Sequence, residues 1–416
     1  MSNGLAILPK NMTNFEKIAL ITPELVEHPR IGFDLRLYQI QVLLKRMVAE
    51  KVVIWDLSAS QMDKDRLLNF GRDGGSLLGG SIAFSKDLVA IGLHLWPDFR
   101  VQGTDTITRN SILRWLDREQ AGVAILVHPH GTDLLPELKR RGVRVFVDCH
   151  NVESDNIRLM YNLAQSAMQK VKVVLRWITY RRWEQRLFPL ADEIWLPSEY
   201  DCRQQSLICE DRIRVRCVPN ALDVNSYNPC QLRRSSDIVF PGSFGYPPNM
   251  EAASVLSDRV LPDVRKSFPN ARLILVGRDS EGQARMLQRP NEVIVTGEVR
   301  DTRPYLCEAG VVAAPILHGS GTRFKILEAL ALGLPVVTTP LGCQGLAVED
   351  SQHLLIRAVD HFAEAISFLL KNPEWASELG RNGRKLIEMN YTWDCVESQL
   401  RTALDLASVH NQMISA

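Results

Sequence analysis

Residues 311–337 contain a strand, a glycine loop, a helix and a second strand in direct succession. The apolar run 311–317 has the composition of a buried strand, and the loop that follows it opens with two glycines. The helix carries Glu328 and ends at Gly333, where an apolar strand resumes. Two strands joined through a helix in this way require a parallel sheet, so this unit limits the chain to an α/β fold.

The loop of this unit is suited to bind an anion. Its glycines let a ligand approach the backbone, the first amides of the next helix have no intrahelical partner, and the helix dipole adds partial positive charge. Arg323 and Lys325 add full charges beside those amides. Glu328 lies on roughly the same helix face as Lys325 and could accept hydrogen bonds from sugar or ribose hydroxyls. The segment therefore favours a sugar nucleotide; a surface helix with an ordinary Lys–Glu pair is the alternative.

Short apolar runs separated by helical stretches fill the chain in two series. The first series of candidate strands comprises 17–22, 52–57, 88–93, 122–127, 143–148, 193–197 and 213–219. After a polar patch at 228–236, the second comprises 238–240, 272–276, 293–296, 311–314, 336–338 and 354–356. Residues 36–49 have the apolar spacing of a first crossover helix. Each series predicts a Rossmann-like domain, with a linker near 222–236.

Further motifs follow in a fixed order around the glycine loop. They are Phe240-Pro241-Gly242-Ser243-Phe244-Gly245, Pro247-Pro248-Asn249, Leu273-Ile274-Leu275-Val276-Gly277-Arg278, Val295-Thr296-Gly297-Glu298-Val299-Arg300-Asp301 and Thr339-Pro340-Leu341-Gly342-Cys343-Gln344-Gly345-Leu346. As an ordered set they resemble the family-4 (group 1) glycosyltransferases of the GT-B fold, in the branch with a Gly-Ser-Gly-Thr-Arg-x-Lys-Ile-Leu-Glu loop. The resemblance covers about residues 237–395 strongly and the first half more thinly.

This resemblance implies two Rossmann-like domains with parallel sheets facing each other across a cleft. The acceptor-side domain would span 1–228, with 392–416 packing back onto it, and the nucleotide-sugar-binding domain 229–391. The implied activity is that of a retaining hexosyl-type glycosyltransferase, which moves a sugar from a nucleotide-sugar donor to a saccharide or lipid-linked saccharide in cell-surface polysaccharide biosynthesis. A non-catalytic nucleotide-sugar binder, or a nucleotide-sugar epimerase or hydrolase on the same scaffold, is the alternative.

Site residues carry over from the family by position. The implied catalytic residues are His150, Arg323 and Lys325, and the implied donor-binding residues are Gly242, Ser243, Val299, Ser320, Gly321, Thr322 and Glu328. Glu328 matches the glutamate that holds the ribose, and Val299 lies in the turn that contacts the base. Ser320 stands where many members have a second glutamate facing the sugar, so the donor sugar stays open. Arg, Lys and helix amides neutralise the diphosphate in this family, so we expect no metal ion and no cofactor.

Two histidine clusters follow predicted strands of the first domain. The run 145–153 leads from an apolar strand into His150, and the resemblance implies that His150 faces the transferred sugar with Asp148, Asn151 and Glu153 around it. Alternatively, Asp148 and Asn151 only end the strand and cap the next helix. His128-Pro129-His130 is expected to be a turn lining the cleft, because no third ligand for a metal is evident.

Bulk properties favour a cytoplasmic enzyme. The chain has 416 residues, a net charge of +1 and no apolar N-terminal signal, so secretion, membrane spanning and nucleic-acid binding are not expected. Its eight cysteines are scattered and are expected to be reduced packing residues. Asp63-Lys64-Asp65 is expected to be a solvated face and not the Asp-x-Asp metal motif of the other glycosyltransferase fold.

Residues 168–186 mix cationic and apolar side chains. A long helix that packs its apolar face on the sheet and solvates its charges explains this pattern. Contact with an anionic membrane surface explains it too, and would make the protein peripheral at the cytoplasmic membrane face. The sequence alone is compatible with both.

Overall fold

The computed structural model describes residues 17–23, 25–26, 32–48, 51–57, 106–128, 130–162, 164, 166–230, 235–319 and 323–404. The predicted strand at 88–93, the Asp63-Lys64-Asp65 motif, Pro129 and Ser320–Thr322 lie outside these residues.

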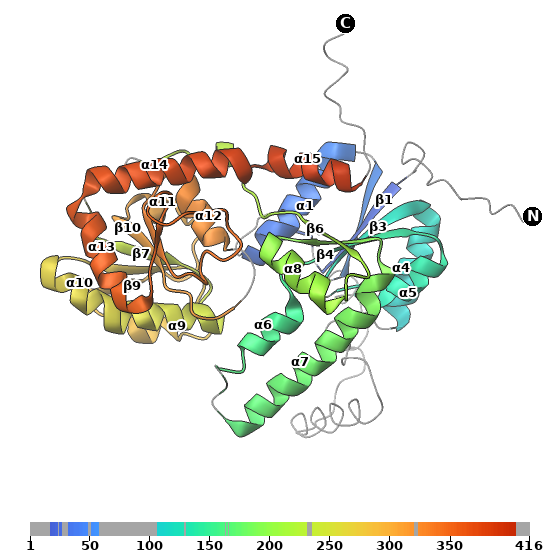
Figure 1. The fold of residues 1–416 in the computed structure, drawn as a ribbon, viewed down its shortest axis with the longest axis horizontal. Helices are drawn as coiled ribbons and strands as arrows, with labels where there is room; N and C mark the ends of the chain where they lie inside the picture. Colours follow the sequence, from blue (N-terminus) through green and yellow to red (C-terminus); the bar gives the residue numbers. More distant parts are fainter. Residues whose placement is uncertain are drawn as a thin grey trace, which may run out of the picture.

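Two six-stranded sheets, both parallel throughout, make up the described chain (Figure 1). The first has the order β2-β1-β3-β4-β5-β6 and the second β12-β11-β10-β7-β8-β9. The strands of the first are β1 Lys17–Thr22, β2 Val52–Asp56, β3 Ala121–Val127, β4 Arg144–Asp148, β5 Glu193–Leu196 and β6 Arg214–Cys217. Those of the second are β7 Ile238–Pro241, β8 Leu273–Val276, β9 Val293–Val295, β10 Val311–Ala314, β11 Val336–Thr338 and β12 Leu355–Ile356.

Helices cover both faces of each sheet. Those of the first half are α1 Gly32–Val48, α4 Thr106–Glu119, α5 Leu135–Arg140, α6 Glu153–Leu159, α7 Ala167–Leu187 and α8 Glu199–Ile208. Those that follow are α9 Pro247–Val255, α10 Leu261–Ser267, α11 Arg303–Cys307, α12 Phe324–Ala331, α13 Phe362–Lys371, α14 Pro373–Asn390 and α15 Trp393–Ala403. Because helices bury both faces of each sheet, the strands have continuous apolar sequences. Every predicted strand among the described residues is present.

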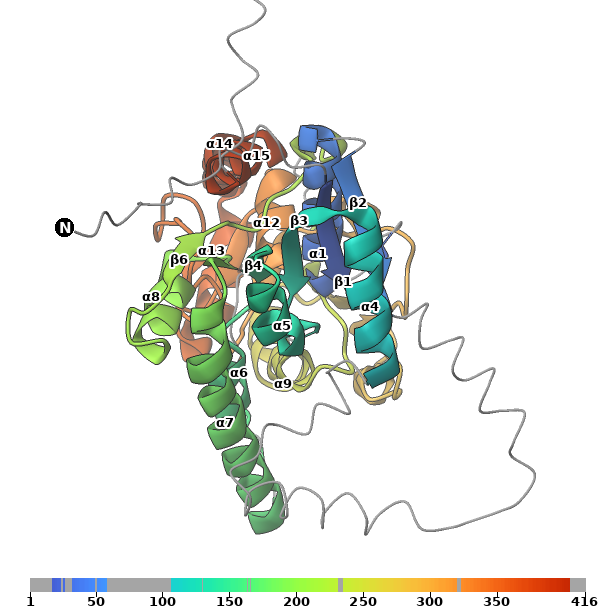
Figure 2. The ribbon, with the colours of Figure 1, turned by 90° about the vertical axis from the view of Figure 1, so that its right-hand side faces the viewer.

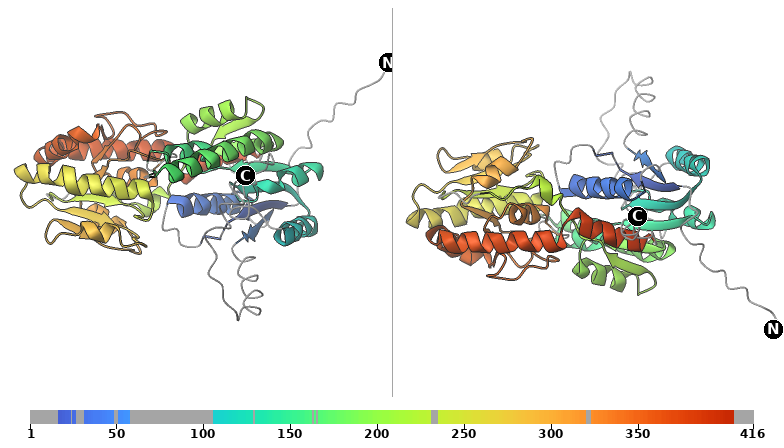
Figure 3. Two further views of the ribbon diagram at one scale, coloured as in Figure 1. Left: turned by 90° about the horizontal axis from the view of Figure 1, so that it is seen from below. Right: turned by 90° about the horizontal axis from the view of Figure 1, so that it is seen from above.

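Helix α15 returns from the second sheet to the first. Helices α14 and α15 run along one side of the molecule, and α15 ends beside α1 (Figures 1 and 3). Val396 and Leu400 of α15 belong to the same core as Leu37 and Ile40 of α1. The two segments that connect the sheets also contact each other, because the Leu222 amide donates a hydrogen bond to the Tyr391 carbonyl at 2.9 Å. The predicted boundary at residues 228 and 229 falls between the sheets and stays a prediction.

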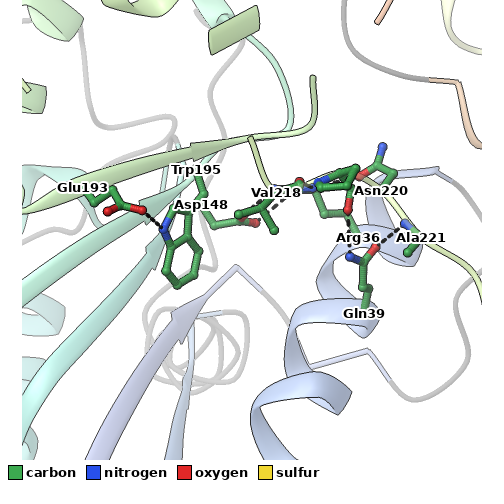
Figure 4. A network of polar contacts seen from close by, with 9 residues as sticks. Arg36, Gln39, Asp148, Glu193, Trp195, Val218, Asn220 and Ala221 are labelled. Atoms are coloured by element: carbon green, nitrogen blue, oxygen red, sulfur yellow. Dashed lines mark hydrogen bonds and ion pairs between the residues drawn. The ribbon is translucent and has the colours of Figure 1, made fainter. Parts of the chain in front are cut away.

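A buried ion pair joins α1 to the end of β4 and to the linker (Figure 4). The Arg36 guanidinium donates to both carboxylate oxygens of Asp148, at 2.6 and 3.2 Å. It also donates to the Val218 carbonyl and the Asn220 side chain, each at 2.9 Å. Arg36 and Asp148 are 1% and 0% exposed. Gln39, one turn further along α1, bonds the linker backbone as well, so α1 holds the linker against the first sheet.

One pair of cysteines contradicts the expectation that all eight are reduced. Cys230 and Cys307 form a disulfide, which ties the linker to the end of α11. The two residues are 77 positions apart, so no local spacing indicated the pairing. The six other cysteines are free, and four of them are buried.

We expect Arg36→Met to lower the free energy of unfolding of the first domain by about 3–5 kcal/mol, because it leaves Asp148 charged, buried and unpaired. Urea unfolding would measure the loss. Arg46→Met is the matched control: Arg46 pairs with Asp394 on the surface, where the two side chains are 44% and 83% exposed, and such pairs contribute about 0–1 kcal/mol. Equal losses for both variants would contradict the assigned role of the buried pair.

Candidate functional site

The candidate site lies at the carboxyl edge of the second sheet, where β7 and β8 end in glycines. The Gly242 amide donates to the Val276 carbonyl at 2.9 Å. A Cβ on Gly277, whose φ is +137°, would lie 2.2 Å from the Gly242 carbonyl oxygen. Neither a side chain nor an L-residue conformation is tolerated there. The two strand ends therefore present bare backbone at the edge where ligands of open parallel sheets bind.

Lys325 in the first turn of α12 points toward this bare backbone. A Cβ on Gly242 would lie 3.2 Å from the Lys325 Nζ. The ammonium donates to Asn249 Oδ1 at 2.7 Å and lies 4.2 Å from the Phe240 ring centroid. The Asn249 amide in turn donates to the Ser243 carbonyl at 2.8 Å. The structure thus brings together three predicted site residues, Gly242, Ser243 and Lys325.

Burial controls the charge of Lys325. It lowers the pKa of Lys325 to about 7; the nearby Arg323 lowers that pKa as well, while Glu328 opposes the shift. An ammonium with one hydrogen bond and one aromatic contact has lost much of its hydration. An anion at this position would restore that stabilisation and keep the lysine protonated.

Arg323 lies where the two domains face each other. A Cβ on Gly319 would lie 2.8 Å from the Tyr246 hydroxyl and 3.2 Å from the Arg323 Nη2, so these groups converge on the glycine loop. Burial lowers the pKa of Arg323, and Asp201 of α8 in the first domain opposes this effect. Helix α12 begins after Arg323 without a side-chain cap. Its N-terminal turn, with Arg323 and Lys325 beside it, suits an anion.

A tyrosine hydrogen bond orients the Glu328 carboxylate. The Tyr227 hydroxyl donates to Glu328 Oε1 at 2.9 Å. Arg303 lies 5.6 Å from the centroid of the Tyr227 ring and pairs with Asp301 at 2.8 Å. Burial raises the pKa of Glu328 to about 7, an effect that the Tyr227 hydrogen bond opposes. One carboxylate oxygen is thus oriented by the protein, and Oε2 makes no hydrogen bond to a described residue.

His150 follows β4 on the first-domain side. Burial lowers the pKa of His150 well below its usual value, and the nearby Arg36 strengthens the effect. The imidazole is therefore neutral at physiological pH. The pKa of Tyr246, raised mainly by burial, is raised further by Glu153, so the start of α6 lies close to the second domain.

Both oxygens of Asp148 bind Arg36 inside the core, and Arg36 in turn lowers the pKa of His150. Two other expectations for the first domain are wrong. His128 does not line a cleft: it is 2% exposed and stacks on Trp183 with ring centroids 4.8 Å apart. The side chain of Asn151 does not cap α6 either, since the N-cap residue is Val152 and no side chain caps that helix.

For several predicted site residues, the structure shows no contact from which a role follows. Val299 packs partly against the second core, and its role at a base stays a prediction. Ser320, Gly321 and Thr322 lie outside the described residues. A cavity of about 840 Å³ lies between α10 and α13, and no predicted site residue lines it. Among the described residues, no group of three His, Cys, Asp or Glu side chains could hold a metal ion.

Sequence reasoning missed the residues that support the site. Asn249 stood in the quoted Pro-Pro-Asn motif without a role, although a turn followed by an amide residue was visible. Tyr227 and Tyr246 gave no signal, because an isolated tyrosine has no informative spacing. Asp201 lies in the first turn of α8, which has the sequence of an ordinary helix start with the Ser198 hydroxyl as cap.

Residues 235–372, which hold most of this site, match the family model of glycosyl transferases group 1. A segment of 196 residues is 29% identical to the phosphatidyl-myo-inositol mannosyltransferase of Mycobacterium leprae. It covers 44% of this chain and 51% of that relative. The chain therefore spans about half the length of this curated relative.

Two solved structures share the arrangement of both sheets. Sucrose-phosphate synthase from Thermosynechococcus elongatus aligns with a TM-score of 0.67 at 16% identity, covering 94% of this chain and 100% of that one. The Anabaena protein HepE, solved with UDP and glucose, aligns with a TM-score of 0.61 at 14% identity and the same coverage. The fold is GT-B, as predicted from the sequence.

We expect Lys325→Met to stabilise the ligand-free protein at pH 7 by about 1–3 kcal/mol, since it replaces a buried cation by an apolar side chain. The folded-state pKa of Lys325 is about 7 and its ordinary value is 10.5. Between these values the unfolded chain binds more protons, so the stability of wild type rises with pH and the advantage of the variant shrinks. Urea unfolding at pH 7, 8 and 9 measures this. A constant difference would contradict the shift, and Lys371→Met, at an exposed site, is the control.

Proposed function

We propose that the protein is a glycosyltransferase that transfers a sugar from a nucleotide-sugar donor. The observation that carries the proposal is the cluster at the start of α12. There Lys325, in the uncapped first turn of α12, lies beside the bare backbone of Gly242, against which Gly277 packs, and Glu328 lies one turn further along the helix. This is the chemistry that a diphosphate attached to a ribose requires. The match of residues 235–372 to glycosyl transferases group 1 supports it.

In the proposed reaction, the leaving nucleoside diphosphate gains negative charge as its bond to the sugar breaks. Lys325, Arg323 and the amides of α12 stabilise that charge without an obligatory metal ion. Glu328 accepts hydrogen bonds from the ribose hydroxyls through the oxygen that Tyr227 does not hold. The turn at Val299 contacts the base. Because UDP and glucose are bound in the HepE structure, a UDP-sugar is the first donor to test.

The acceptor approaches from the first domain. His150 is neutral, so it can donate or accept a hydrogen bond at the transferred sugar without placing a charge there. We propose front-face attack of the acceptor hydroxyl with retention of configuration and no covalent enzyme intermediate. Ser320 in place of the commoner glutamate leaves the choice of hexose to other contacts.

We propose a saccharide or lipid-linked saccharide as acceptor, in cell-surface polysaccharide biosynthesis at the cytoplasmic face of a membrane. The similarity to a mannosyltransferase named for a lipid substrate supports a lipid-linked acceptor. Among the described residues, no helix is both long and apolar enough to cross a bilayer, so membrane contact in this proposal is peripheral.

A thermal-shift screen against UDP-, GDP-, ADP- and dTDP-sugars without added metal tests the donor site directly. A selective rise in melting temperature with one nucleotide supports the proposal, because a ligand that binds only the folded state stabilises it. No shift with any of the four, in a folded protein, contradicts it and favours a different role for the cluster.

We expect Glu328→Ala to weaken binding of the donor by about 1–3 kcal/mol, or roughly 5- to 150-fold, if its ribose hydrogen bonds are buried. Titration calorimetry with the nucleotide and with its 2′,3′-dideoxy analogue separates the cause. Wild type should discriminate between the two, and Glu328→Ala should not. Tyr227→Phe keeps the carboxylate and should lose less affinity. Unchanged discrimination in Glu328→Ala would remove the ribose assignment.

A further inference from the structure

Helix α7 has two apolar faces, although the fold requires one. Tyr180, Trp183 and Leu187 are buried in the core on one face of the first sheet, and Val173 and Trp177 pack partly against it. These residues recur every three or four positions and form the inward face. The helix starts at Ser166, whose side chain forms a capping box with Gln169. The capping box therefore fixes where the helix begins, ahead of the residues that pack on the core.

The second apolar face points to solvent. Met168, Val171, Val174 and Ile178 are 53%, 52%, 37% and 36% exposed. They also recur every three or four positions, and at 100° per residue they lie opposite the inward face. The α6–α7 hairpin extends away from both sheets (Figures 1 and 2). No described element covers this outward stripe.

Cations surround the stripe. The positive residues of α7 are Lys170, Lys172, Arg176, Arg181, Arg182 and Arg186, and its single carboxylate, Glu184, is buried. At 100° per residue, Lys170 and Arg181 lie on one side of the stripe and Lys172 on the other, while Arg182 and Arg186 continue its line. None of the six forms an ion pair with a carboxylate of the described residues. Arg176 lies near Glu153, whose pKa it lowers, so the excess of positive charge comes from the other five.

We propose that the outward face of α7 docks on an anionic lipid bilayer. An exposed apolar stripe bordered by uncompensated lysines and arginines is the pattern of a helix that lies in the membrane interface. Each cation near such a surface contributes favourable electrostatic energy, and the stripe contributes by burial in the acyl boundary. The inference deepens the proposed function, because it names the surface from which a lipid-linked acceptor is delivered.

A cavity beside the stripe fits the same partner. It has a volume of about 320 Å³ and lies between α6 and α7. Its lining residues are Arg158, Leu159, Tyr161, Asn162, Val173, Val174 and Trp177. Val174 belongs both to this cavity and to the outward stripe. The Trp177 indole N–H is buried and has no hydrogen-bond partner among the described residues.

A second copy of the chain fits this face less well. Pairing two α7 helices along their stripes would bring the cationic borders of both together, with no acidic residue on the helix surface to compensate. Like charges at close range oppose such pairing. The bilayer offers both the negative charge and the apolar depth that the face lacks.

The hairpin connects the docking face to the candidate site. Helix α6 begins at Glu153, which influences the pKa of Tyr246 in the second domain, and it ends at the tip of the hairpin. Glu184 of α7 accepts hydrogen bonds from the Ser154 amide and hydroxyl at 3.1 and 2.5 Å. A bilayer under α7 is therefore separated from His150 by little more than the hairpin, whose longer helix spans about 30 Å.

Flotation of the full chain with lipid vesicles tests the docking. We expect wild type to float with phosphatidylglycerol-containing vesicles, to stay behind with pure phosphatidylcholine, and to detach as salt is raised. Lys170→Gln/Lys172→Gln and Val171→Ser/Ile178→Ser should each lower the vesicle partition coefficient about tenfold or more. Lys371→Gln/Arg381→Gln removes the same charge from exposed sites of the second domain and should bind like wild type.

Nucleotide binding is measured on the same variants by thermal shift. Unchanged shifts show that the variants are folded and that docking is separate from the donor site. Loss of flotation in both α7 variants supports the proposal even if no nucleotide binds to any protein. Failure of wild type to float, or flotation of both α7 variants like wild type, overturns it. Concentration-dependent dimerisation that the same substitutions abolish would assign the face to a second copy and also overturn it.

Discussion

The arrangement of the first domain and of the segment that leaves it depends on the buried ion pair between Arg36 and Asp148. A charge with almost no exposure is tolerated only when every polar atom around it is satisfied. Here the guanidinium bonds the carboxylate, the Val218 carbonyl and Asn220 together. One side chain thereby fixes the end of β4, the direction of α1 and the path of the linker. His150 stands two residues after Asp148, so its position follows from the same bonds.

The donor side uses buried charge differently. In the first domain a full ion pair compensates burial, whereas Lys325 has a neutral amide and an aromatic ring as its partners. Glu328 likewise has a phenol and not a cation. Burial moves the pKa of both groups to about 7. Incomplete compensation of this kind is costly for an empty protein and favourable for one that binds a charged ligand, which is why perturbed pKa values mark functional sites.

The sequence predicted the strands and helices well, but it did not predict which distant side chains contact each other. Apolar runs located the strands because parallel strands buried on both faces leave a strong local signal. The glycine loop indicated Lys325, and the family resemblance indicated Gly242. The ion pair of Asp148 was not predicted, because its partner, Arg36, lies 112 residues away. The environment of His128 depends on Trp183, which is also far from it in sequence. The disulfide and the support by Tyr227 are of the same kind: they are tertiary contacts between residues whose own surroundings look ordinary.

Residues 168–186 fitted two explanations on sequence alone, and the structure shows why neither excluded the other. A helix that only packs on a sheet has one apolar face, but α7 uses Trp183 and Leu187 for packing and still exposes Val171 and Ile178. The Ser154–Glu184 hydrogen bonds join α6 to α7 in one projecting arm. Because that arm begins beside His150, any surface that orients α7 also orients the acceptor side of the candidate site.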